Sequence, residues 1–244
     1  DDDFSAFVFK IQANMNKAHR DRIAFMRIVS GRFDADKEVY HVQGGKKLRL
    51  SRPQQLMAAE REIIEEAYAG DIIGVFDPGI FSIGDTLCAP GKKFRFDPIP
   101  TFAPEHFKRV RSLDTMKRKQ FLKGMEQIAQ EGAIQIFKTP YTGMEEVIVG
   151  VVGTLQFDVL EYRLKNEYNV ELYMEGLPYE YLRWIETDDG EPVKEEDLIL
   201  GTDVKLVEDY KGNQLLLFGS QWAIGWTEER NKNLTFHEFG GTKF

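Results

Sequence analysis

The sequence has 244 residues, of which 42% are hydrophobic and 30% charged, and its formal net charge is −8. This composition is typical of a globular protein and excludes the disordered, collagen-like and disulfide-rich classes. No apolar run approaches the roughly 18 residues that a membrane-spanning helix needs. Because three aspartates stand at the N-terminus instead of a Met or a signal peptide, we expect a fragment of a longer protein.

The single cysteine, Cys88, cannot form an intramolecular disulfide, which suits a reducing cytoplasm and predicts a cytoplasmic protein. Cys88 follows a short alternating stretch, so we expect it to be a small buried residue. A catalytic thiol needs a histidine partner, and no histidine lies near it in the sequence.

The charge is unevenly distributed along the chain. Residues 187–244 carry 12 acidic and 6 basic side chains, whereas Lys10–Arg52 carries 11 basic against 4 acidic and Lys108–Lys123 carries 7 against 1. Two basic patches on an acidic protein favour selective contact with phosphate groups, and a solvated helix face explains the second patch equally well. The candidate RNA-contacting residues are Lys17, His19, Arg20, Arg22, Arg27, Arg32, Lys108, Arg109, Arg111, Lys117, Arg118, Lys119 and Lys123.

The first part of the chain, up to Asp97-Pro98, is predicted to be mostly strand. Short runs rich in β-branched and aromatic residues alternate with turn signals, as in a small antiparallel β-barrel. Gln43-Gly44-Gly45 indicates a hairpin, because glycine adopts positive φ without steric cost. One segment departs from this pattern: residues 53–68 have apolar positions at helical spacing.

Pro98-Ile99-Pro100 marks the predicted domain boundary, with one domain over 1–98 and a second over 99–244. In the second domain, residues 104–131 predict a helical region that ends near Gly132. Two strands, a second helix and another strand follow. The second helix has one apolar stripe, formed by Leu155, Val159, Leu160 and Leu164. Helices on one face of a sheet in this order predict a ferredoxin-like α/β domain.

Residues 181–244 are expected to form a C-terminal extension of three strands and a helix over 221–230. This helix carries Trp222 and Trp226 four residues apart, on one face. Because the surrounding segment is acidic, we interpret the pair as core packing and not as a platform for stacked bases.

Motifs that carry catalysis or bind cofactors are missing from the sequence. Gly44-Gly45-Lys46-Lys47 and Gly91-Lys92-Lys93 lack the remaining positions of a phosphate-binding loop, so nucleotide hydrolysis by this chain alone is not expected. The four histidines are scattered, and one cysteine cannot build a zinc site. No catalytic, cofactor-binding or metal-binding residue is therefore predicted. A small hydrolase, the alternative of another class, would need convergent carboxylates or a nucleophile–base pair in a pocket.

Several stretches together resemble the release factor 3 family of bacterial translational GTPases. They are Phe7–Asn16, His19–Arg27, Glu65–Gly74, Phe102–Glu105, Gly153–Val159, Arg163–Glu171 and Arg183-Trp184. The resemblance covers nearly the whole chain, although residues 187–213 match weakly and Lys17 stands where a proline is expected.

The resemblance implies the last two of three domains, a β-barrel and an α/β domain, without the domain that binds GTP and Mg²⁺. It also implies a non-catalytic fragment that acts in translation termination. Its partners would be the bacterial ribosome, through small-subunit RNA and protein, its own GTPase domain and, indirectly, class-one release factors. The alternative within this reading is the equivalent part of an elongation factor G or a ribosomal protection protein. Because the family places residues 53–68 in the barrel, we expect strand and tight turn there despite the helical period.

Overall fold

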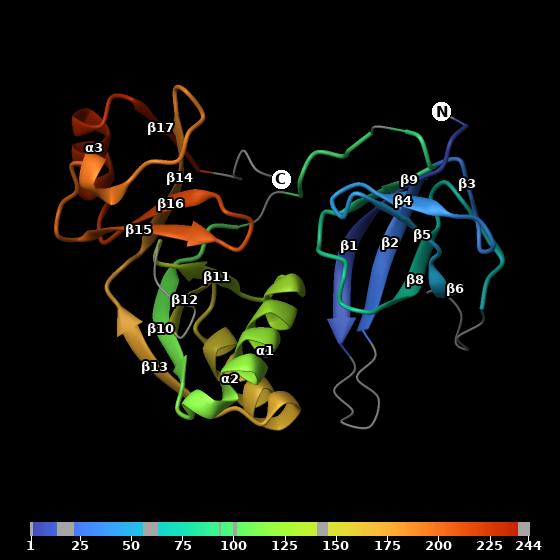
Figure 1. Cartoon of the computed structure of the whole chain (residues 1–244), viewed down its shortest axis with the longest axis horizontal. Coiled ribbons are helices and arrows are strands. Elements are labelled where there is room, and N and C mark those ends of the chain that lie inside the picture. The colour runs from blue at the N-terminus through green and yellow to red at the C-terminus, as the bar shows by residue number, and fades with distance from the viewer. Residues whose placement is uncertain are drawn as a thin grey trace. The chain divides into compact units, whose positions relative to one another are not determined.

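The computed structural model describes residues 2–13, 22–55, 63–92, 94–99, 102–140 and 146–238. The chain divides into two compact units. The first unit comprises residues 1–99 with 130–132, and the second comprises residues 100–129 with 133–244. Strands predominate in both units (Figure 1). Within the described residues, no helix has the length and apolar character needed to cross a membrane.

The first unit contains a seven-stranded antiparallel sheet with the order β5-β4-β9-β1-β2-β8-β6 and a two-stranded sheet of β3 and β7 (Figure 1). The strands are β1 (Ser5–Ala13), β2 (Arg22–Ser30), β3 (Arg32–Asp34), β4 (Val39–His41), β5 (Lys46–Leu48), β6 (Ser51–Gln55), β7 (Glu66–Tyr68), β8 (Ile72–Asp77) and β9 (Thr86–Cys88). The large sheet has end strands β5 and β6, and no ladder in the described residues joins them.

One hydrophobic core lies inside the first unit. Alternate residues of β1 and β2, such as Val8 and Met26, are completely buried because successive side chains of a strand point to opposite faces. Phe33 of β3 and Ala67 of β7 belong to the same core, so the small sheet packs against the large one. The predicted burial of Cys88 is confirmed, since this residue is 1% exposed.

The turn predictions for this unit are confirmed where the residues are described. β4 and β5 pair across the glycine turn, and Gly45 has a φ of +63°. The helical period of 53–68 does not give one continuous helix, because β6 extends to Gln55 and β7 begins at Glu66. Residues 56–62 lie outside the described residues. Ladder hydrogen bonds of β6 with β8 and of β7 with β3 therefore override the local helical preference.

The second unit contains one antiparallel sheet of eight strands with the order β13-β10-β12-β11-β15-β16-β14-β17 (Figure 1). The strands are β10 (His106–Ser112), β11 (Gln135–Lys138), β12 (Glu146–Val151), β13 (Leu172–Leu177), β14 (Tyr181–Thr187), β15 (Val204–Asp209), β16 (Gln214–Phe218) and β17 (Leu234–His237). The helices are the 3₁₀ turns η1 (Thr115–Lys117) and η2 (Glu195–Asp197) and the α-helices α1 (Arg118–Gln130), α2 (Leu155–Tyr168) and α3 (Gln221–Arg230).

The chain passes through β10, α1, β11, β12, α2 and β13 before it enters the C-terminal strands. Helices α1 and α2 lie on the same face of the four strands of this segment (Figure 1). Phe121 and Met125 of α1 and Leu160 of α2 share a buried cluster with Val110 and Val149 of the strands. This cluster fixes both helices to the sheet.

The prediction of one helical region over 104–131 is wrong for its first half, where β10 is a strand. Within β10, Phe107 and Val110 are buried on opposite faces of the sheet, in two different clusters, as the two-residue period of a strand requires. The helical turns begin only after Asp114, whose Oδ1 accepts a hydrogen bond from the Met116 amide at 2.9 Å. Gly132 follows α1 with a φ of +82°, which confirms the predicted stop.

The predicted apolar stripe of the second helix is partly wrong. Leu160 and Leu164 of α2 are buried, but Leu155 is 70% exposed and Val159 48% exposed. The buried face of α2 instead includes Phe157 and Arg163. The helix therefore has a second apolar strip on its solvent side, which periodicity alone cannot distinguish from the first.

The C-terminal segment continues the same sheet and does not form a separate layer. Its strands bury one face, including Leu182 and Leu217, against Phe107 of β10, and the other face against α3. The three strands predicted for this segment are confirmed as β14, β15 and β16, and the helix predicted over 221–230 is confirmed as α3. The core-packing interpretation of the tryptophans is wrong for Trp222, which is 72% exposed.

Candidate nucleic-acid interface

The structure does not place the first basic patch on one common surface. Lys17, His19 and Arg20 lie outside the described residues. Arg22 begins β2 as a buried side chain, with its Nε 3.9 Å from Oδ2 of the buried Asp77. The guanidinium of Arg22 therefore faces a buried carboxylate and not solvent.

Arg27 and Arg32 are exposed, but only Arg27 is available for an anionic ligand. Arg27 lies on the outer face of β2, and no partner for its guanidinium is present in the described residues. Arg32 Nη2 lies 2.8 Å from Asp34 Oδ1 and 2.6 Å from Glu66 Oε2. These carboxylates, Asp34 first, raise the pKa of Arg32 and neutralise its charge locally.

The second basic patch divides between the two faces of the sheet and the start of α1. Lys108 lies on the helix-covered face, where its Nζ is 4.7 Å from the centre of the Phe157 ring. A lysine in this position contributes its aliphatic chain to packing and a cation–π contact with the ring.

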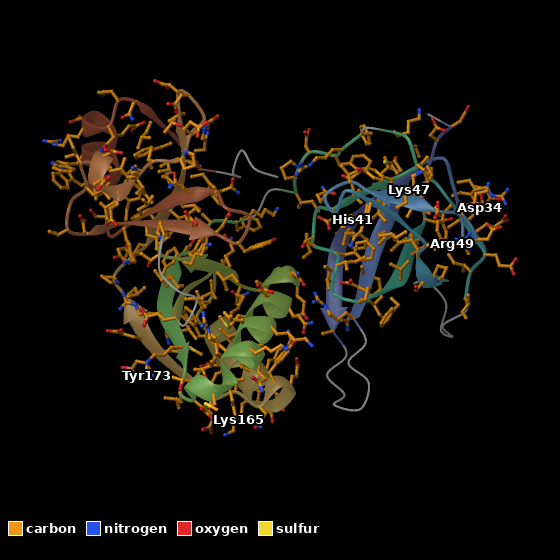
Figure 2. The ribbon with its side chains drawn as sticks, viewed as in Figure 1. Asp34, His41, Lys47, Arg49, Lys165 and Tyr173 are labelled. Atoms are coloured by element: carbon orange, nitrogen blue, oxygen red, sulfur yellow. The ribbon has the colours of Figure 1, made fainter. Side chains whose placement is uncertain are left out.

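Arg109 and Arg111 occupy the opposite face of β10. Arg109 bridges the neighbouring strands, with its Nε 2.9 Å from Glu146 Oε1 and its Nη1 3.2 Å from Glu175 Oε2. Arg111 is exposed, and its Cζ lies 4.6 Å from the centre of the Tyr173 ring, which projects from β13 (Figure 2). An exposed arginine stacked on a tyrosine presents one cation in a fixed orientation, whereas the charge of Arg109 is already compensated.

The remaining cations of this patch gather at the start of α1. Lys117 Nζ donates a hydrogen bond to the Asn169 carbonyl oxygen at 2.8 Å, and Arg118 is the first residue of the helix. Lys119 and Lys123 are exposed one turn apart, and neither has an ion pair or hydrogen bond within the described part of the chain. Residues four apart on a helix share a face, so these two ammonium groups lie on one exposed face of α1.

Sequence reasoning left three further exposed cations, Lys46, Lys47 and Arg49, out of the candidate set. Lys46 and Lys47 belong to edge strand β5, and Arg49 follows it. Figure 2 labels Lys47 and Arg49. All three are exposed and have no side-chain ion pair or hydrogen bond among the described residues. The signal was present in the sequence as a basic run directly after a hairpin turn.

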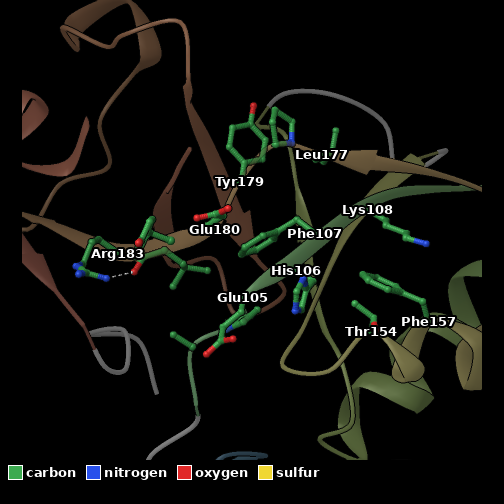
Figure 3. A pocket seen from close by; sticks show the side chains of 15 residues that line it. Glu105, His106, Phe107, Lys108, Thr154, Phe157, Leu177, Tyr179, Glu180 and Arg183 are labelled. Atoms are coloured by element: carbon green, nitrogen blue, oxygen red, sulfur yellow. Dashed lines mark hydrogen bonds between the residues drawn. The ribbon is translucent and has the colours of Figure 1, made fainter. Parts of the chain in front are cut away.

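A pocket of about 730 Å³ lies in the second unit, between the start of β10 and β14. Phe107, Leu177 and Tyr179 form much of its apolar lining, and Lys108 and Arg183 lie on different sides of it (Figure 3). Burial raises the pKa of the Tyr179 hydroxyl. The lining contains no serine or cysteine, so the hydrolase alternative finds no such nucleophile here.

Metal and thiol chemistry have no support in the described residues. These residues contain no group of three or more His, Cys, Asp or Glu side chains that could hold a metal ion. Cys88 is buried, its Sγ–H points to the Lys92 carbonyl oxygen at 3.6 Å, and burial raises the pKa of the thiol. A raised pKa disfavours the nucleophilic thiolate.

Two family models match the chain, one for each unit. "Elongation factor G domain 2" matches residues 3–90, and "Class II release factor RF3, C-terminal domain" matches residues 96–228. A crystal structure of a protein from Thermus thermophilus has the same fold, with a TM-score of 0.56 and 17% identity, covering 86% of this chain and 31% of that one.

Curated relatives named "Peptide chain release factor 3" match almost the full chain. The protein of Symbiobacterium thermophilum is 56% identical over 96% of this chain, and that of Gloeobacter violaceus is 47% identical over 97%. The protein of Listeria monocytogenes is 47% identical over 95%. The chain spans 43–44% of the length of these relatives. Because the release factor model alone covers more than half of its residues, the chain belongs to the class II release factor RF3 family.

Proposed function

We propose that this chain is the ribosome-docking and coupling part of a release factor that promotes the GTP-dependent departure of class-one release factors from the ribosome. The observation that carries this proposal is the match to the release factor C-terminal domain over residues 96–228. The curated relatives named release factor 3 match nearly all of this chain. The proposal places the chain in translation termination in the bacterial cytoplasm.

In this proposal, residues 1–98 form the β-barrel domain that follows the nucleotide-binding domain in translational GTPases. Residues 99–244 form the third domain, with 181–244 as its extension. The strand order β13-β10-β12-β11, with two helices on one face, supports a ferredoxin-like arrangement in the first half of this domain. The curled seven-stranded sheet supports the barrel.

GTP hydrolysis belongs, in this proposal, to a nucleotide-binding domain outside the chain. The sequence contains no phosphate-binding loop, and the described residues contain no acidic cluster that fits Mg²⁺. This chain's own contribution is to bind ribosomal RNA and protein and to transmit the state of the nucleotide-binding domain. No catalytic step is assigned to its residues.

The exposed face of α1 is the part of the chain best suited to RNA. Lys119 and Lys123 present two cations that form no ion pair among the described residues, and Lys117 and Arg118 stand directly before them. Phosphate contacts of this kind position a protein on RNA and make its binding sensitive to salt. Lys17, His19 and Arg20 remain predicted contacts, and Arg27, with Arg111 on its tyrosine, extends the set.

Co-sedimentation of the chain with bacterial ribosomes across a salt series tests this function. We expect binding at low salt that weakens steeply as salt rises, because counterions compete for the phosphates. No binding at any salt concentration would contradict independent docking. The alternative, that the chain is part of an elongation factor G, is supported by the match over residues 3–90 and also predicts ribosome binding. Only the release factor proposal predicts that the full-length protein releases bound class-one release factors, so this assay distinguishes the two proposals.

A further inference from the structure

Helix α3 presents an aromatic surface to solvent that the proposed RNA contacts do not use. Its buried face consists of Ala223, Ile224 and Thr227, which pack on the C-terminal part of the sheet. On the opposite face, Trp222 is 72% exposed and its ring centre lies 6.3 Å from that of Trp226. Aromatic residues such as tryptophan are enriched in protein interfaces relative to the rest of the surface.

The two tryptophans and Arg230 form a ladder with one residue in each turn. The Arg230 Cζ lies 4.0 Å from the centre of the Trp226 ring, and its Nη1 donates a hydrogen bond to the Trp226 carbonyl oxygen at 3.3 Å. One ring thus already carries a cation. Trp222, the next ring toward the helix N-terminus, has no cation over it in the described part of the structure.

Gly225 lies between the tryptophans on this exposed face. A Cβ at Gly225 would meet no atom within 4 Å, so packing within the chain does not require a glycine there. A glycine in a helix interior costs about 1 kcal/mol relative to alanine. Its position beside the exposed Trp222 and the half-buried Trp226 leaves a notch through which a second backbone can approach the helix closely.

Acidic residues outnumber basic ones around the ladder, where Lys232 is exposed just after the helix and Lys194 Nζ lies 3.8 Å from Glu196 Oε1. Glu228 and Glu229 are exposed on α3 itself. The acidic turn η2 (Glu195–Asp197) is held near the end of the helix, because Asn231 exchanges two 2.9 Å hydrogen bonds with the Ile199 backbone. Near the helix start, Asp203 Oδ2 lies 3.5 Å from Ser220 Oγ. Such a field attracts cations and repels phosphate.

We propose that the Trp222–Gly225–Trp226 face of α3 binds a basic protein segment, with a lysine or arginine of the partner stacked on Trp222. Tryptophan is the best aromatic acceptor for a cation–π contact and is enriched in the centres of protein interfaces. The acidic surroundings disfavour RNA as the occupant. They also disfavour a second copy of this chain, because a symmetric contact would bring the same acidic residues together. The inference goes beyond ribosome docking through α1 and does not depend on it.

The test is a fluorescence-anisotropy titration of the 244-residue chain against a short labelled peptide with arginine at alternate positions. We expect Trp222→Ala to weaken binding about tenfold. Gly225→Gln is expected to weaken binding without lowering the melting temperature, because it fills the notch and improves helix propensity. The matched control is Tyr162→Ala, which removes an aromatic ring that is 59% exposed on α2 and should leave the affinity unchanged.

Three results would overturn the proposal. The first is no binding, or equal affinity of the wild-type chain and Trp222→Ala. The second is unchanged affinity when glutamine replaces every arginine of the peptide. The third is Trp222-dependent binding of a single-stranded oligoribonucleotide, or Trp222-dependent dimerisation in sedimentation analysis, which would assign the surface to RNA or to a second copy. The peptide titration does not depend on ribosome binding. A failure of the ribosome-docking proposal can therefore be distinguished from a failure of the α3 proposal.

Discussion

His41 Nε2 lies 2.8 Å from Asp85 Oδ2, and both residues are buried in the first unit. The same Oδ2 accepts a hydrogen bond from the Ser82 amide at 2.9 Å. The Asp85 carbonyl oxygen accepts one from the Val8 amide. Asp85, which lies in the turn before β9, thereby connects that turn to both β4 and β1, two strands that are distant from each other in sequence.

Asp85→Ala should destabilise the first unit by about 2–4 kcal/mol, because the His41 ring and the Ser82 amide would lose their buried acceptor. Tryptophan fluorescence cannot report on the first unit, because all three tryptophans lie in the second unit. The loss of stability is therefore measured by hydrogen exchange of the β1, β4 and β9 amides. The matched control is Asp71→Ala, which removes one exposed bond to the Tyr68 amide. Equal exchange in the two variants would contradict the role assigned to Asp85.

Two glycine-to-alanine changes in the helices should have opposite effects. At Gly124 of α1, a Cβ would lie 2.8 Å from Leu164 Cδ1 and 3.0 Å from the Tyr168 ring, so alanine should destabilise the second unit by about 1–3 kcal/mol. At Gly225 a Cβ meets nothing, so alanine should stabilise it by up to about 1 kcal/mol. Urea unfolding followed by tryptophan fluorescence measures both. If both substitutions change the free energy of unfolding in the same direction, the packing described around Gly124 and Gly225 would be contradicted.

The carboxyl group of Asp34 should titrate below its usual range. The hydrogen bond from Lys37, whose Nζ is 3.0 Å from Asp34 Oδ2, lowers its pKa, and the charge of Arg32 adds to this effect. A carboxyl whose pKa is lower in the folded state stabilises the fold above its unfolded pKa, and this contribution is lost as the pH falls through the folded pKa. NMR titration should show that Lys37→Ala raises the pKa of Asp34. An unchanged pKa would assign the shift to another cause.

Cys88 should react slowly with alkylating reagents in the folded protein. Its side chain is buried and its pKa is raised by that burial, so both access and the thiolate fraction are low. Labelling with iodoacetamide, followed by mass spectrometry, should be slow in buffer and fast in urea. Labelling at the same rate in both conditions would contradict the burial of Cys88.

The strands and turns with strong local signals were predictable from the sequence. The glycine hairpin before Lys46 and the helix over 221–230 follow from residue chemistry alone. Residues 104–112 were misassigned because Phe107 and Val110 are three apart, which satisfies a helical period as well as burial on two faces of one strand. A sheet covered on both sides removes the alternation that identifies a strand.

The candidate site was only partly predictable, because charge in a sequence does not reveal which cations already have partners. In the sequence Arg22, Arg32 and Arg109 are basic residues like Lys119 and Lys123. In the structure they lie against acids that are distant in sequence, Asp77, Glu66 and Glu146 respectively. Trp222 shows the same limit for apolar residues. The acidic surrounding segment suggested core packing, and only the position of α3 on the sheet determines which face is buried.

The most direct test of the account is ribosome co-sedimentation of the variant Lys119→Glu/Lys123→Glu across a salt series. If these lysines contact phosphates, the variant should bind more weakly, and the slope of log affinity against log salt should fall in magnitude by about 1.5. The control Lys194→Glu/Lys211→Glu makes the same charge change at exposed positions in the acidic segment and should retain the wild-type slope. An α1 variant with wild-type affinity and slope would contradict α1 as the docking surface.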